Sequence, residues 1–500
     1  MSGAETEGLA GPAARGLLWT TAQKWVGRIS ALVTILVLAR LLTPEQFGLV
    51  AVALAVIPAV YLLADLGFST YLVQAENPTE RAYSTAFWYS TTAGLLLAAG
   101  LWLVGPLMEM IVGAPGVAAV LAGLSPAVLV VALGAVPTAR LRREMRFRTL
   151  AIQGFLAAVA GQIVAVVMAV TGFGVWALVA QTVVMQLVAS ALAWSFARWR
   201  PRWVFDTADF AGMIRYGSSV VATELIALSR LWAENAIVAA TLGLAGLGYL
   251  NVAQRLIVTA QELSASAITP VTTVVFAQIR AHAPRLASGY VRAQGMISGI
   301  VIPLMVFITV GAVHLIPLLF GDQWGASVLP AQALAVAGIL TVGASLDQGL
   351  FYGVGRPGRW LAYALVIDLV TVAATFALAP FGLAAVAWGF AAVAFLATCV
   401  RIPMVSALLL IPVRPLAEQF GRVLLLAAVV ALAGLAAATA VQTWPPILAL
   451  LVIGVAIVGG WLLVLRWVLP GAASELGRYG HKLGARLGWG TSGARRWGIS

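Results

Sequence analysis

The chain has 500 residues, of which 62% are hydrophobic and only 10% are charged, and its formal net charge is +12. Soluble domains carry roughly 25% charged residues, so this composition excludes a soluble protein and a disordered one. The single cysteine, Cys399, excludes an internal disulfide scaffold. We therefore expect an all-α polytopic membrane protein. In such a protein the positive excess indicates loops near anionic lipid rather than nucleic-acid binding, and we expect no metal and no cofactor.

Hydrophobic windows predict about fourteen transmembrane helices. In chain order they cover residues 16–42, 47–74, 83–108, 117–139, 149–170, 173–197, 211–241, 246–277, 294–320, 327–352, 360–380, 382–410, 420–442 and 445–469. We expect these helices to divide the chain into a cytoplasmic N-terminus (1–15), a six-helix bundle (16–200), a second six-helix bundle (201–411), two extra transmembrane helices (412–470) and a basic cytoplasmic tail (471–500).

Three short segments between helices carry turn signals. The segment from Thr43 to Gln46 places Thr at an N-cap, Pro at the first helical position and Gln at the third, which predicts a capping box. Glycine-rich turns are predicted at 172–174 and 381–382. The connections on this side of the helices are all too short for a separate domain, which argues against a membrane-bound polymerase or ligase.

Arginine-rich loops all fall on the other side of the predicted helices. They include the cluster from Arg140 to Arg148, the segment 198–202 and the loop after the twelfth helix, which Arg401, Arg414 and Arg422 surround, whereas the opposite loops contain only Arg40. By the positive-inside rule the arginine-rich side is cytoplasmic, so both termini are expected in the cytoplasm and the number of helices is expected to be even.

A shift of 200 residues aligns the first two predicted helices with the seventh and eighth. Identical residues then occur at Ala39/Ala239, Leu42/Leu242, Gly48/Gly248, Val52/Val252, Ala53/Ala253, Ile57/Ile257 and Leu63/Leu263. Both copies start on the same side of the membrane, so this is a parallel repeat. A parallel repeat of six helices predicts two bundles related by an axis along the membrane normal, with a substrate site between them.

Most ionisable residues inside the predicted helices fall on the first two helices of each half. A charge at the bilayer centre costs at least about 2.5–3.5 kcal/mol, so such residues are expected to face protein or a wet cavity. Four cations are candidate substrate-binding residues for an anionic substrate: Lys24, Arg28, Arg230 and Arg255. Four acids are candidates for ion coupling or charge pairing: Asp65, Glu224, Glu234 and Glu262.

Some of these residues also have a purely structural interpretation. Arg230 and Glu234 are four residues apart and would neutralise each other on one helix face. Lys24 and Arg28 have no acid at helical spacing on their own helix, which favours a role in binding. In the second half, Asp347, Asp368 and His314 are isolated. The two aspartates are interpreted equally well as hydrogen-bond acceptors or as functional groups, and the histidine as an interfacial residue.

Several short motifs resemble those of one family. The run from Leu38 to Ala51 resembles the opening hairpin of Wzx-type bacterial polysaccharide flippases, in the branch that serves exopolysaccharide, colanic-acid-like and teichuronic-acid-like polymers. The segments 141–147, 172–181, 321–324 and 355–357 are similar to this branch at matching places, and the resemblance spans most of residues 16–410.

The resemblance implies a MATE-like fold of two six-helix bundles in the bacterial inner membrane. It also implies that a polyprenyl-pyrophosphate-linked saccharide moves from the inner to the outer leaflet by alternating access, coupled to protons or sodium. A polysaccharide polymerase is a candidate partner. Two alternatives share the fold: a peptidoglycan-precursor flippase, and a MATE-type exporter of cationic drugs, for which we would expect an acidic cavity.

Overall fold

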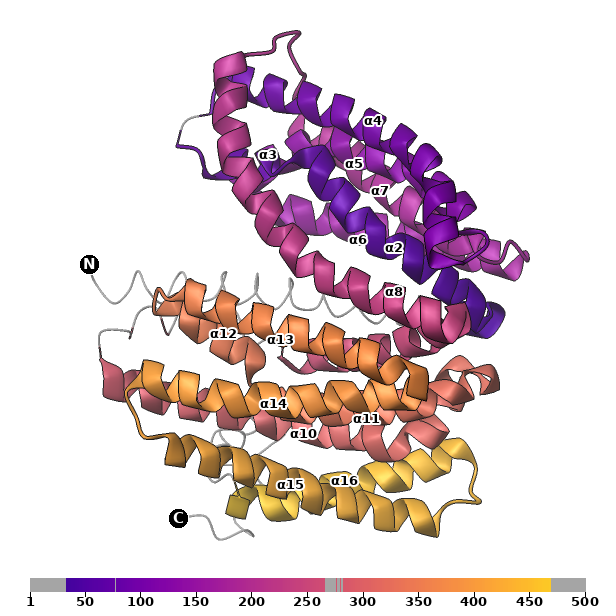
Figure 1. The fold of residues 1–500 in the computed structure, drawn as a ribbon, viewed down its shortest axis with the longest axis vertical. Coiled ribbons are helices and arrows are strands. Elements are labelled where there is room, and N and C mark those ends of the chain that lie inside the picture. The colour runs from indigo at the N-terminus through magenta and orange to yellow at the C-terminus, as the bar shows by residue number, and fades with distance from the viewer. Residues whose placement is uncertain (1–32, 77, 266–275, 277–278, 280–281, 469–500) are drawn as a thin grey trace, which may run out of the picture. The chain divides into compact units, whose positions relative to one another are not determined.

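The computed structural model describes residues 33–76, 78–265, 276, 279 and 282–468, and every regular element in this part of the chain is a helix (Figure 1). Twelve helical segments among these residues are long and apolar enough to cross a membrane. The all-α polytopic class is therefore confirmed. The number fourteen remains a prediction, because most of the first predicted helix lies outside the described residues.

The predicted capping box starts α2 (Pro44–Asp65). The backbone N–H of Gln46 donates to the Thr43 hydroxyl at 3.4 Å, and the Gln46 side chain accepts from the Thr43 backbone at 3.1 Å. The helix ends where Leu66 and Gly67 take positive φ values of 47° and 72°, so α3 (Phe68–Gln74) starts as a separate short helix. This break re-aims the chain at the end of the span.

Five longer helices continue from there: α4 (Glu80–Val112), α5 (Val117–Arg143), α6 (Phe147–Val170), α7 (Trp176–Ala197) and α8 (Thr207–Ala265). The predicted turn between α6 and α7 is confirmed, with Gly172 and Gly174 at φ 84° and 56°. In α8 the backbone leaves helical geometry at Gly243, where φ is 73° and ψ is 177°. This break lies where the sequence predicts a turn between two spans.

The remaining helices are α10 (Ala283–Phe320), α11 (Val328–Leu340), α12 (Ala344–Gly353), α13 (Pro357–Leu378), α14 (Leu383–Leu409), α15 (Val413–Ala440) and α16 (Pro446–Val468), with short 3-10 helices at Asp322–Ser327 and Ala379–Phe381. The predicted turn at 381–382 is confirmed by Gly382, which has a φ of 98°. The last two helices pack against each other and against α10.

The described residues fall into two compact units. The first contains residues up to Asn251 together with Thr375–Leu383, and the second contains the rest. In the first unit α5 packs against α4 and α7, and an aromatic core that includes Phe68, Phe87 and Trp199 joins the ends of α3, α4 and α5. The division into two bundles of six helices with two added helices remains a prediction.

Two glycines bring α2 and α8 into backbone contact within the first unit. A Cβ on Gly48 would lie 1.8 Å from the carbonyl oxygen of Leu244, and a Cβ on Gly248 would lie 2.0 Å from that of Pro44. The 200-residue shift that aligns the two glycines also aligns Pro44 with Leu244. The two contacts are therefore reciprocal, as a two-fold axis between the repeats requires, and they support the predicted internal repeat.

Candidate functional site

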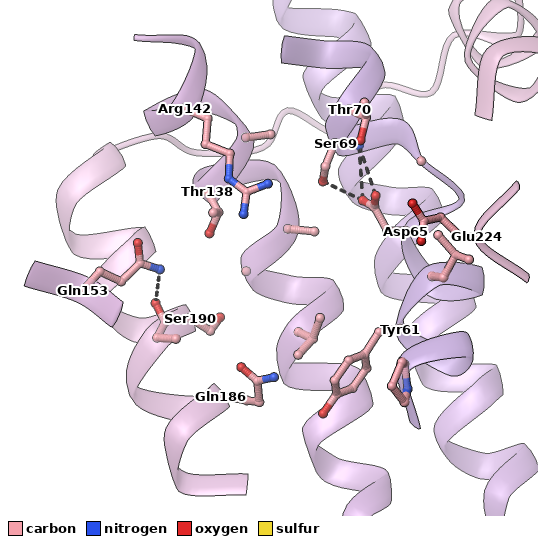
Figure 2. A pocket seen from close by; sticks show the side chains of 18 of the residues that line it. Tyr61, Asp65, Ser69, Thr70, Thr138, Arg142, Gln153, Gln186, Ser190 and Glu224 are labelled. Atoms are coloured by element: carbon pink, nitrogen blue, oxygen red, sulfur yellow. Dashed lines mark hydrogen bonds between the residues drawn. The ribbon is translucent and has the colours of Figure 1, made fainter. Parts of the chain in front are cut away.

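A polar cavity of about 570 Å³ lies within the first unit, lined by side chains from α2, α3, α5, α6, α7 and α8 (Figure 2). Its polar lining consists of Tyr61, Asp65, Ser69, Thr70, Thr138, Arg142, Gln153, Gln186, Ser190 and Glu224. Groups of this kind are costly among apolar helices unless water or a ligand satisfies them. The cavity is therefore the candidate site.

Asp65 lies on one wall of the cavity at the end of α2, and its carboxylate caps α3. Oδ1 accepts from the Ser69 hydroxyl at 2.6 Å, and both carboxylate oxygens accept from the Ser69 backbone at 3.2 and 3.3 Å. The left-handed backbone at Leu66 and Gly67 turns the chain so that these groups meet. Asp65 therefore combines a structural role with a position in the cavity wall.

Arg142 is the cationic residue of the described lining, and the sequence reasoning did not single it out. The prediction that a loop begins at Arg140 is wrong for the first arginines of this cluster, because α5 continues to Arg143; their cytoplasmic side remains a prediction. Helical geometry, at about 100° per residue, points neighbouring side chains in different directions. Of the arginines in this cluster, Arg142 lines the cavity and its neighbours bind protein groups.

The neighbouring arginines fix the local structure. The Arg143 guanidinium donates to the carbonyl oxygens of Leu72 at 3.1 Å and Glu76 at 2.6 Å, and also to those of Val73 and Ala75. These are the carbonyl groups at and beyond the end of α3, which a cation stabilises. Arg146 donates to the carbonyl oxygen of Phe196 at 2.9 Å.

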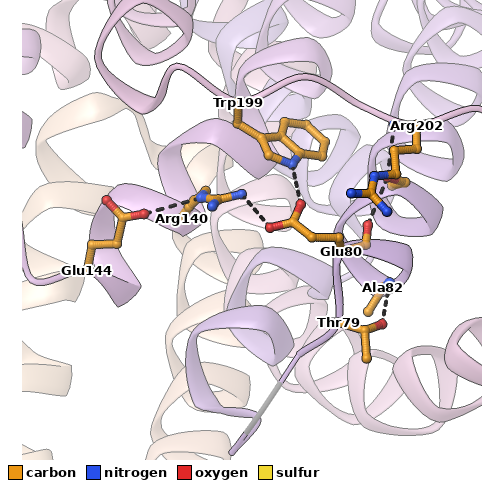
Figure 3. A network of polar contacts seen from close by, with 8 residues as sticks. Thr79, Glu80, Ala82, Arg140, Glu144, Trp199 and Arg202 are labelled. Carbon is orange, nitrogen blue, oxygen red and sulfur yellow. Dashed lines mark hydrogen bonds and ion pairs between the residues drawn. The ribbon is translucent and has the colours of Figure 1, made fainter.

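Arg140 belongs to a network that joins α5 to α4 (Figure 3). It pairs with Glu80 at 2.9 Å and with Glu144 at 3.2 Å, and the Trp199 indole donates to the second oxygen of Glu80 at 2.9 Å. The segment between α7 and α8 is fastened to α4 as well, because the backbone N–H of Arg202 donates to the Ser84 hydroxyl at 3.1 Å. These contacts hold the cavity wall that carries Arg142 at a fixed place.

Uncharged polar groups line another part of the cavity. Gln153 donates from Nε2 to the carbonyl oxygen of Ala189 at 2.8 Å, while its Oε1 is buried and has no hydrogen-bond partner among the described residues. Tyr61 and Gln186 lie side by side at the end of the cavity away from Arg142 (Figure 2). Amides and phenols both donate and accept hydrogen bonds, so this part of the cavity suits a ligand rich in hydroxyl groups.

The structure places the predicted site residues in different surroundings. Asp65 and Glu224 come together in the lining of the cavity. Arg230 pairs with Glu234 at 2.6 Å, with side chains that are 39% and 4% exposed, which is the structural interpretation considered for this pair. Arg230 is not part of the cavity lining.

Arg255 is exposed on the part of α8 that belongs to the second unit. Lys24, Arg28 and the side chain of Glu262 lie outside the described residues. The charged lining that the structure describes is thus two carboxylates and one guanidinium, and the meeting of the four predicted cations in one cavity remains a prediction.

Asp347 is not isolated, contrary to the sequence interpretation. Its Oδ2 lies 2.8 Å from Nε of Arg401, and the two side chains are 2% and 6% exposed. Arg401 lies within α14, inside the helix predicted at 382–410. Helical spacing identifies only partners on the same helix, so the sequence does not reveal the pairing of Asp347 with an arginine on another helix.

The helices and the polar cavity define a polytopic membrane protein built like a small-molecule or lipid transporter. The family described as polysaccharide biosynthesis protein matches residues 37–329, and the chain belongs to this family.

Three relatives carry related names. The chain is 27% identical over 343 residues to the succinoglycan biosynthesis transport protein ExoT of Rhizobium meliloti (strain 1021), covering 68% of this chain and 69% of ExoT. It is 26% identical to the lipopolysaccharide biosynthesis protein WzxC of Escherichia coli (strain K12), covering 62% of this chain and 63% of WzxC. It is 25% identical to the teichuronic acid biosynthesis protein TuaB of Bacillus subtilis (strain 168), covering 59% of this chain and 62% of TuaB.

Two solved structures share the fold. The lipid II flippase MurJ in an inward closed conformation superposes with a TM-score of 0.73 at 12% identity, covering 90% of this chain and 100% of MurJ. An inward-facing multidrug-resistance MATE transporter of the MOP superfamily gives a TM-score of 0.62 at 18% identity, covering 76% of this chain and 95% of the transporter. The expected MATE-like fold is confirmed.

Proposed function

We propose that the protein is a flippase that moves a polyprenyl-pyrophosphate-linked oligosaccharide from the inner to the outer leaflet of a bacterial inner membrane, for synthesis of a cell-surface polysaccharide. The observation that carries the proposal is the polar cavity of the first unit, which combines an arginine with amide and hydroxyl groups. The names of ExoT, WzxC and TuaB, each tied to the biosynthesis of a surface polymer, support the same substrate class.

The two kinds of polar lining match the two polar parts of such a substrate. The Arg142 guanidinium is a bidentate donor for phosphate oxygens, and it lies at the end of α5 that the positive-inside rule places near the cytoplasm. Tyr61, Gln153 and Gln186 supply donors and acceptors for sugar hydroxyl groups. The prenyl chain remains in the surrounding lipid, so the protein handles only the polar head.

Two carboxylates in the same cavity provide a way to release the substrate. Asp65 and Glu224 face the cavity together with Arg142, and a negative charge near Arg142 competes with a pyrophosphate for the same donors. Binding of a proton or a sodium ion at these carboxylates would remove that competition and favour substrate binding, and loss of the ion would restore it and favour release. We therefore propose ion-coupled alternating access, with both chain termini in the cytoplasm and a polysaccharide polymerase acting on the transported unit.

One observation favours a second candidate function. The described charges in the cavity are two acids and one base, which suits a cationic cargo of the kind that a multidrug-resistance transporter exports. The fold shared with MurJ keeps a peptidoglycan-precursor flippase as a further alternative. The family match over residues 37–329 and the relatives' names favour the saccharide-lipid substrate over both.

The experiment compares Arg142→Gln with Arg148→Gln, an arginine of the same cluster that is exposed and is absent from the cavity lining. In cells that lack the wild-type protein, lipid-linked repeat units should accumulate on the cytoplasmic leaflet. The rate at which these units become accessible from the outer face of spheroplasts should fall about 10- to 100-fold in the Arg142 variant, since a hydrogen bond to a charged group contributes about 1.5–3 kcal/mol.

The control variant should support the wild-type rate at equal protein abundance. An unchanged rate for Arg142→Gln would remove the proposed phosphate contact. Accumulation on the outer leaflet in the absence of the protein would instead indicate a polymerase, and would overturn the flippase assignment.

A further inference from the structure

A closed cluster of polar side chains lies in the second unit, at the meeting point of α10, α12 and α14. Asp347 accepts from Arg401 at 2.8 Å through Oδ2 and from the Tyr290 hydroxyl at 2.5 Å through Oδ1. Arg401 also donates to the Thr398 hydroxyl at 3.3 Å, and that hydroxyl donates to the carbonyl oxygen of Leu340 at 2.8 Å. One carboxylate therefore holds three helices together.

Stability alone gives a weak reason for this cluster. The charged side chains are 2% and 6% exposed, and a buried ion pair is often no more stabilising than apolar residues of the same volume, because both ions lose their hydration. Ionisable residues inside a transmembrane segment are rare and are usually functional. Apolar side chains could have filled the same space, because the helices that carry these residues are otherwise strongly hydrophobic.

A small cavity of about 30 Å³ borders the cluster. Tyr290, Asp347 and Arg401 all line it, and so does Gln294 of α10. The volume is sufficient for a water molecule. The Oε1 atom of Gln294 is buried and has no hydrogen-bond partner among the described residues. The cavity is thus lined by Gln294, whose Oε1 accepts no hydrogen bond from the described residues, and by Arg401, which donates to the carboxylate of Asp347.

The surroundings of Asp347 contain few other groups that could exchange a proton. The neighbouring helix α15 lines the cavity with the uncharged residues Leu416, Gln419, Phe420 and Val423. On α13, the Tyr363 hydroxyl donates to the carbonyl oxygen of Ala397 at 3.1 Å. Among the described residues, the charged and titratable groups that face the carboxylate are therefore Arg401 and Tyr290.

We propose that Asp347 is a proton-binding site of the transport cycle, a role that rests on the proposed flippase function. A hydronium ion from the cavity gives one proton to a carboxylate oxygen of Asp347, which leaves a water molecule and a neutral carboxylic acid. Arg401 keeps its positive charge and turns to Oε1 of Gln294, the acceptor that is unused in this structure. The carboxylate link between α10, α12 and α14 is then released, and loss of the proton restores it.

The first experiment measures proton uptake directly and needs no saccharide. Purified full-length protein in lipid nanodiscs is taken from neutral to acidic pH, and the uptake is followed with an indicator dye and with the infrared C=O band of protonated carboxylic acids. Asp347→Asn should take up one proton fewer per chain than wild type and should lack the corresponding infrared band.

Asp347→Asn alone leaves the buried positive charge of Arg401 without a carboxylate and could unfold the protein. A second variant therefore controls for loss of folding. Asp347→Asn/Arg401→Gln replaces the ion pair by a neutral pair that can hydrogen-bond, and it should show the same missing proton with a thermal midpoint near that of wild type. Gln294→Leu keeps the carboxylate but removes the second acceptor, and it should take up fewer protons at the same acidic pH. Equal uptake by wild type and the double variant would overturn the proposal.

The second experiment asks whether the proton is used in transport. In spheroplasts, the movement of lipid-linked repeat units should slow on addition of a protonophore for wild type, and should be slow with or without it for the double variant. A double variant that lacks the proton but keeps a protonophore-sensitive rate would overturn the coupling role. If wild type moves no lipid-linked saccharide and still takes up the proton at Asp347, the flippase function fails and the proton site stands.

Discussion

The close contact between α2 and α8 makes a quantitative prediction about Gly48. In an ordinary helix interior, Gly→Ala stabilises by about 0.5–1 kcal/mol, because alanine loses less backbone entropy on folding. At Gly48 the added Cβ would lie 1.8 Å from the Leu244 carbonyl oxygen, whereas ordinary contact begins at 3.4 Å, so the helices would have to move apart by about 1.6 Å. Overpacking of this kind costs about 1–3 kcal/mol.

The matched controls are Gly100→Ala in α4 and Gly154→Ala in α6, where a Cβ would meet nothing within 4 Å. We expect Gly48→Ala and Gly248→Ala to lower the thermal midpoint in detergent, followed by tryptophan fluorescence, and the controls to leave it unchanged or raise it. For a unit of 150–250 residues, 1 kcal/mol corresponds to about 2–4 °C. A midpoint for Gly48→Ala at or above that of the controls would refute the contact.

The reciprocity of the contact can be tested with the double variant Gly48→Ala/Gly248→Ala. Once one alanine has separated the two helices, the second should meet less resistance, so its additional cost should be smaller than its cost alone. Fully additive losses would mean that the two glycines lie in independent contacts, and the two-fold relation between them would be lost.

Two further predictions concern the network around the cavity wall. Arg143→Ala should destabilise the protein by about 1–3 kcal/mol, because it leaves the carbonyl groups at the end of α3 without a donor; a thermal midpoint equal to that of Arg148→Ala would contradict this. Glu80→Gln keeps an acceptor for the Trp199 indole but loses the charge that Arg140 binds, and because both side chains are partly exposed the loss should be no more than about 1 kcal/mol, measured by the same assay and reduced by added salt.

Local features of the fold could be predicted from the sequence. The capping box at Thr43 and Gln46 and the turn glycines at 172 and 174 were predicted correctly, because each depends on residues only a few positions apart. The pairing of Arg230 with Glu234 belongs to the same class, since a spacing of four residues places both on one helix face.

The partners of the buried charges could not be predicted in this way. Arg401 and Asp347 are 54 positions apart and meet only because α12 and α14 pack together. Arg142 and Arg143 are adjacent in the sequence, yet one lines the cavity and the other caps a helix. The side of α5 that faces the cavity is decided by the packing of α2, α6 and α7 around α5. No pattern of nearby residues in the sequence contains that information.

The internal repeat keeps residues that the packing of the helices requires, but not the charged residues of the cavity. The 200-residue shift keeps glycine at 48 and 248, where backbones touch. At the same shift, Asp65 corresponds to Ala265 and Glu224 to Lys24.

The two carboxylates of the cavity are therefore not kept as carboxylates at the matching positions of the other half. A substrate with a phosphate at one end and sugars at the other has no two-fold symmetry, so the groups that bind it need not repeat where the backbone contacts do. We accordingly place the anion-binding Arg142 in the first unit and the proposed proton site at Asp347 in the second.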